Sequence, residues 1–178
     1  FMGYDRKFLE YRGSDDCFGR SLWGLGYIHA CDVMPGGIRT VAGEILKAAA
    51  AKCEELYYIR GKAYAILGLC RWRDRKAREY VAALAADLAT ALEANATDDW
   101  FWFEDCLTYG NAVMPFALLE AANLCDNINW LTAGQRSLDF LLKTTFDNDV
   151  FRPVGCKGWY RKGETPAMYD QQPIEACE

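Results

Sequence analysis

Histidine is almost absent from this 178-residue sequence, which contains only His29. The eight cysteines are scattered singly, and no two of them form a Cys-x-x-Cys pair. Because structural zinc sites draw on closely spaced Cys and His residues, we expect no metal site and no cofactor. The sequence also lacks a dinucleotide fingerprint, a Walker loop and a Gly-x-Ser-x-Gly elbow. It therefore gives no sign of dinucleotide binding, of P-loop nucleotide binding or of the serine nucleophile of an α/β-hydrolase.

Excess positive charge and long apolar runs are lacking as well. The net charge is −5 and the basic run 71–78 is typical of a solvated helix start, so we expect no nucleic-acid partner. No apolar run reaches the roughly 20 residues that cross a bilayer, so we expect no membrane partner. The first residues do not form a signal peptide. We expect a reduced, cytoplasmic compartment, since several cysteines occupy apolar positions of predicted helices, namely Cys31, Cys53, Cys70 and Cys125.

What the sequence does contain is helical periodicity. Apolar spacing predicts six helices, at about 16–31, 38–56, 61–72, 74–94, 106–125 and 129–144. Pro35-Gly36-Gly37 breaks the chain after the first helix. The Gly-, Pro- and Trp-rich stretch after residue 146 predicts a long ordered loop or hairpin, and a seventh helix is expected to start near residue 173.

The predicted helices alternate in character along the chain. The first, third and fifth are rich in Gly, Ala and aromatic residues, whereas the second, fourth and sixth carry most Lys, Arg and Glu. A helix that is apolar all round is buried, and one with a narrow apolar stripe lies outside. The pattern predicts an all-α fold of stacked helical hairpins, either an α/α toroid or an α-solenoid. Because no fixed repeat recurs, we favour the toroid. Residues 1–178 would form a single partial domain, about half of a six-hairpin barrel.

Polar and aromatic residues gather near the starts of the first, fifth and seventh predicted helices. Asp15 and Asp16 open the first helix, one of them as a cap, and Arg20 lies one turn after Asp16. Two further segments, 98–111 and 158–175, combine carboxylates, amides and aromatic rings. If every second helix begins at the same end, these segments meet on one rim. Such a combination is typical of a saccharide site.

The candidate residues fall into two groups. Hydrolysis of a glycosidic bond needs a carboxylic acid and a second carboxylate, and Glu104 or Asp105 with Asp170 is the favoured pair. The candidate catalytic carboxylates are Asp105, Glu104, Asp170 and Asp16. The candidate saccharide-binding residues are Arg20, Trp102, Tyr109, Asn111, Trp159, Tyr160, Gln171, Gln172 and Glu175.

Three strings carry a resemblance to a known group: GSDDCFGRSLWGLG, DWFWFEDCLTYGNAVMPFALLEA and GWYRKGETPAMYDQQPIEA. They resemble the helical domain of bacterial proteins catalogued as glycosyltransferases, which is similar to the six-hairpin glycosidase superfamily. In that group the first motif reads E-D-S-H-G-R, so Asp15 and Cys17-Phe18 depart from it. The resemblance implies an (α/α)₆ toroid whose funnel binds carbohydrate, and a possible glycosyltransferase domain in a longer protein.

Three hypotheses follow for the function. The first is a carbohydrate-active toroid with glycoside hydrolase-like acid/base chemistry. The second is a non-catalytic domain that binds a saccharide or glycoconjugate, or acts as a scaffold, beside a glycosyltransferase. The third is an α-solenoid that binds proteins. Only the first two require the polar segments to share one rim.

Overall fold

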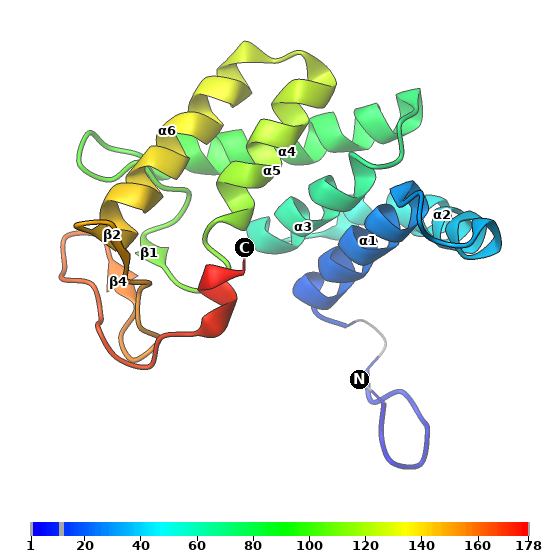
Figure 1. Cartoon of the computed structure of the whole chain (residues 1–178), viewed down its shortest axis with the longest axis horizontal. Coiled ribbons are helices and arrows are strands. Elements are labelled where there is room, and N and C mark those ends of the chain that lie inside the picture. The colour runs from blue at the N-terminus through cyan, green and yellow to red at the C-terminus, as the bar shows by residue number, and fades with distance from the viewer. Residues whose placement is uncertain (1, 11–12, 178) are drawn as a thin grey trace.

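The computed structural model of the chain describes residues 2–10 and 13–177. Six α-helices dominate these residues, as the sequence predicted (Figure 1). Their bounds are α1 Asp15–Ala30, α2 Gly36–Ala50, α3 Ile59–Leu69, α4 Arg75–Asn95, α5 Val113–Cys125 and α6 Ile128–Thr145. Two short 3-10 helices, η1 Ala51–Glu55 and η2 Pro173–Ala176, and four two-residue strands complete the order.

Helix α3 lies between α1 and α5 and forms the centre of the molecule. All residues from Ala63 to Leu69 are buried, which confirms that the third predicted helix is an inner one. Helix α4 buries only one stripe of residues, as an outer amphipathic helix does. Helix α1 differs from the prediction because it buries one side only, against α3.

Helices α1 and α3 run in the same direction at very short range. Gly19 lies against Gly61 near the start of both helices, and Gly26 lies against Gly68 near their ends. A β-carbon on Gly26 would come 2.3 Å from the Gly68 carbonyl oxygen, so the backbones touch directly. The expectation that alternate helices begin at the same end is confirmed for this pair.

The fifth predicted helix begins later than expected. Residues 106–112 are not helical, and α5 starts at Val113. Strand β1 (Cys106–Leu107) instead pairs with β4 (Tyr160–Arg161), and Gly110 has a φ of 59° that a helix does not allow. The side chain of Asn111 closes this turn by bonding the Thr108 backbone. The helical spacing of apolar residues continues through residues 106–112, but strand pairing with a distant segment holds Cys106 and Leu107 in an extended conformation.

The C-terminal stretch is a loop with short strands, as predicted. Strands β2 (Phe146–Asp147) and β3 (Val150–Phe151) form a small hairpin after α6. The seventh predicted helix is represented by η2, a single 3-10 turn. The second predicted helix also changes to 3-10 geometry after Ala50. Among the described residues, none belongs to a helix long and apolar enough to cross a bilayer.

The eight cysteines are free thiols, and three of them, Cys53, Cys70 and Cys106, are buried. Burial, with the negative charge of Glu54, raises the pKa of Cys53 from 9.0 to about 12. Burial, with the charge of Glu120, raises the pKa of Cys70 to about 12 as well. Both thiols therefore keep their protons in the folded state at pH values where unfolded thiols lose them.

This difference predicts that the protein loses stability at alkaline pH. Unfolded thiols ionise near pH 9 while these two stay protonated, so the free energy of unfolding falls from pH 9 to about 12. The slope amounts to roughly 1 kcal/mol per pH unit for each thiol. Urea unfolding between pH 8 and 11 measures it. Cys53→Ala should flatten the slope, whereas Cys17→Ala, at an exposed thiol, should not. An unchanged slope in Cys53→Ala would contradict this explanation.

Candidate functional site

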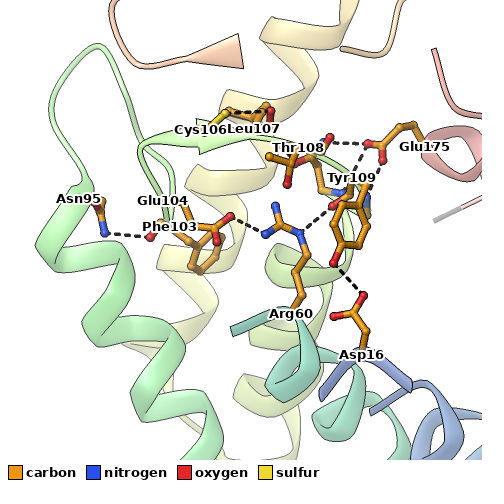
Figure 2. A network of polar contacts seen from close by, with 12 residues as sticks. Asp16, Arg60, Asn95, Phe103, Glu104, Cys106, Leu107, Thr108, Tyr109 and Glu175 are labelled. Carbon is orange, nitrogen blue, oxygen red and sulfur yellow. Dashed lines mark hydrogen bonds and ion pairs between the residues drawn. The ribbon is translucent and has the colours of Figure 1, made fainter. Parts of the chain in front are cut away.

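The candidate site lies where α1 and α3 begin and where the chain leads into α5. Asp16 is in the first turn of α1, and Tyr109 precedes α5. The Tyr109 hydroxyl donates a hydrogen bond of 2.9 Å to Asp16 Oδ2 (Figure 2). Two segments 93 residues apart in sequence therefore meet directly. Burial, and then the bond to Asp16, raises the pKa of Tyr109, so the phenol remains a donor to higher pH than an exposed tyrosine does.

Arg60, in the first turn of α3, joins the same group. Its Nη1 donates to Glu104 Oε2 at 2.6 Å, and its Nε donates to the Tyr109 carbonyl oxygen at 2.7 Å. The residue is only 7 % exposed, whereas the Glu104 side chain is 33 % exposed. The guanidinium thus fixes one carboxylate and one backbone turn while leaving the carboxylate open to solvent. Arg60 was not among the residues predicted from the sequence; its signal was an arginine in the first turn of a helix whose one other charged residue is Lys62.

Glu175, from the third predicted segment, holds the turn before α5 in place. Its carboxylate accepts from Gly110 N at 2.5 Å and from Asn111 Nδ2 at 2.8 Å. Asn111 is 1 % exposed, so its amide is committed to the turn and not open to a ligand. Glu175 and Asn111 were both predicted to bind substrate. In the structure, their contacts hold the turn that contains Tyr109.

Asp15 caps a helix, but not the one it belongs to. The N-cap of α1 is Ser14, whose Oγ accepts from Cys17 N at 3.2 Å. Asp15 is buried, and its Oδ2 accepts from the backbone nitrogens of Tyr57 and Tyr58 at 2.7 and 2.8 Å. These two residues lead into α3. Of the two acidic residues at the start of α1, Asp15 therefore has a structural role, whereas Asp16 contacts Tyr109.

These residues line one open cavity of about 680 Å³. Its volume lies within the range of small-molecule sites in proteins. The lining combines carboxylates, a guanidinium and phenol rings. It consists of Gly13, Ser14, Asp15, Asp16, Tyr57, Tyr58, Ile59, Arg60, Glu104 and Tyr109.

Trp102 and Arg20 are two predicted site residues that do not line the cavity. The Trp102 side chain is fully buried, with ring centroids 5.3 Å from Phe103 and 6.0 Å from Phe140. The ring is part of the core and does not line the cavity, so we leave Trp102 out of the proposed site. Arg20 also lies off the cavity lining: it donates to the Tyr64 hydroxyl, with its guanidinium 4.2 Å from that ring.

The other predicted residues lie on the surface around the C-terminal loop. The side chains of Asp105, Asp170 and Gln171 are exposed, and none of them lines the cavity. Tyr160 packs against Trp100 and borders a separate cavity of about 590 Å³. Trp159 and Gln172 are half-buried in the same loop. The favoured catalytic pair was Glu104 or Asp105 with Asp170, and of these three carboxylates only Glu104 lines this cavity.

Known proteins offer no guide to this site. Comparison with known protein families, with curated protein sequences and with solved structures finds no match to this chain. Within the part of the chain that the structure describes, no three His, Cys, Asp or Glu side chains gather as metal ligands. The chemistry of the cavity itself is therefore the basis for a functional proposal.

Proposed function

We propose that this chain binds a saccharide in the cavity where α1, α3 and the segment before α5 meet. The observation that carries the proposal is the convergence of Asp16, Glu104 and Tyr109 around Arg60. Carboxylates and a guanidinium bind hydroxyl groups, and the phenol ring of Tyr109 offers an apolar face to sugar C–H surfaces. The fold we infer is part of an (α/α) toroid of the six-hairpin glycosidase type, in a longer protein that includes a glycosyltransferase domain.

The activity we propose is glycoside hydrolase-like acid/base chemistry by Asp16 and Glu104. Both side chains line the cavity, although they come from segments far apart in the sequence. One carboxyl would give its proton to the leaving glycosidic oxygen as the bond breaks. The other would take a proton from the attacking water, or attack the anomeric carbon itself. The separation of the two carboxyls around the ligand would decide between inversion and retention.

The second candidate function is saccharide binding without cleavage. One observation favours it: Glu104 already pairs with Arg60, and Asp16 already accepts from Tyr109. Carboxylates held in this way are fixed acceptors for sugar hydroxyls and need no proton transfer. Such a domain would present a glycan to the glycosyltransferase domain that the resemblance implies.

Incubation with neutral oligosaccharides tests both functions. If the chain cleaves them, Asp16→Asn and Glu104→Gln should each lower turnover by about a hundredfold or more, since each removes a proton-transfer group. Asp105→Asn and Asp170→Asn, at exposed carboxylates off the cavity, are matched controls that should leave turnover unchanged. Binding without cleavage supports the second function. Absence of binding to every saccharide would contradict both.

A further inference from the structure

Two neighbouring tyrosines at the edge of the cavity have no role in the chemistry above. Tyr57 and Tyr58 are 79 % and 66 % exposed, although both line the cavity. Their rings stand edge to face, with centroids 5.1 Å apart and planes at 88°. Neither ring is buried in the core, so packing does not explain them. Adjacent exposed aromatic rings beside a cavity are typical of a binding surface.

The backbone of these two tyrosines is held in place by hydrogen bonds to Asp15. Both peptide nitrogens donate to the single Asp15 Oδ2, and Asp15 is 8 % exposed. Hydrogen bonds to an ionised carboxylate are among the stronger ones in proteins. The two rings therefore extend from a preorganised turn, which lowers the entropy that a ligand must overcome on binding.

The charge of the cavity restricts the ligand further. Its lining contains three carboxylates, on Asp15, Asp16 and Glu104, and one guanidinium, on Arg60. The local charge is therefore negative when these groups are ionised. An anionic sugar such as a uronate would be repelled, whereas a neutral one would not.

We propose that the ligand is a neutral oligosaccharide of at least two rings, with one ring between Asp16 and Glu104 and the next against Tyr57 and Tyr58. This inference rests on the proposed saccharide function and adds to it the length and the charge of the ligand. Tyrosine is well suited to such a subsite because its rigid ring provides contact area at low entropic cost.

Calorimetric titration tests the inference. The probes are neutral glucose, mannose and galactose oligomers of one to three rings, and a digalacturonate of matched length. For the neutral sugar that binds, affinity should rise by about tenfold from one ring to two. Tyr57→Ala or Tyr58→Ala should remove that gain and leave monosaccharide affinity unchanged. Tyr57→Phe and Tyr58→Phe retain the ring and should retain the gain.

The control is Tyr4→Ala, which removes another exposed tyrosine that is not part of the cavity. It should bind all probes as the unchanged protein does. Affinity that does not depend on length, or digalacturonate binding as tight as that of neutral sugars, would overturn this inference while the saccharide function stands. Failure of every saccharide to bind would overturn both.

Discussion

Arg60→Met is expected to lower the free energy of unfolding by about 3 kcal/mol, because it breaks a largely buried ion pair. The change leaves Glu104 without its counter-ion and the Tyr109 carbonyl without its donor. Glu104 is one-third exposed, so water compensates part of the loss and the effect stays at the lower end of such changes. Methionine preserves the apolar stem of arginine, so the measurement reports the polar contacts. Urea unfolding measures the difference.

Two further variants distinguish the loss of this ion pair from a nonspecific loss of stability. Arg60→Met combined with Glu104→Gln should recover about 1 kcal/mol or more, because residues in contact are coupled. Arg75→Met is the control: this residue pairs with Glu79 at 3.6 Å and its side chain is 92 % exposed, so it should cost less than about 1 kcal/mol. Equal costs at Arg60 and Arg75 would mean that Arg60 does not organise the site.

Gly26→Ala is expected to destabilise the protein by about 3 kcal/mol through overpacking between α1 and α3. The new methyl group would lie 2.3 Å from the Gly68 carbonyl oxygen and 2.8 Å from its Cα. Backbone atoms cannot rotate away, so the two helices have to move apart. That movement would also shift Asp16 relative to Arg60. Thermal and urea unfolding, together with saccharide titration, measure both effects.

The matched control for this substitution lies two residues earlier on the same helix. A β-carbon on Gly24 meets no atom within 4 Å. Gly24→Ala should therefore raise stability by about 0.5–1 kcal/mol, the intrinsic preference of a helix for alanine over glycine. Similar effects of the two changes would contradict the close packing of α1 on α3.

The helical part of this fold could be predicted from the sequence because its signals are local. Helix α4 was expected at about 74–94 and is Arg75–Asn95, since a long amphipathic repeat follows the capping residue Asp74. The meeting of Asp16 with Tyr109 could also be anticipated. It required only that alternate helices begin at the same end, and the glycines at positions 19, 26, 61 and 68 permit that parallel packing.

The remaining features depend on contacts between distant segments. Nothing near Cys106 in the sequence indicates that it pairs with Arg161 in a strand, so the start of α5 was misplaced. Trp102 and Tyr58 both lie in an aromatic cluster two residues before a charged residue, yet the first is in the core and the second is exposed. Composition cannot separate them, because burial is decided by the neighbours that each ring meets after folding. The exposed position of Asp170 has the same cause.

The most direct test of the central claim, one saccharide cavity at the starts of α1, α3 and α5, is an NMR titration. A neutral disaccharide is added to isotope-labelled protein, and backbone amide shifts are followed residue by residue. We expect the largest changes at Asp16, Tyr58, Arg60 and Tyr109. Changes confined to the separate cavity beside Phe101, or no change with any disaccharide, would contradict it.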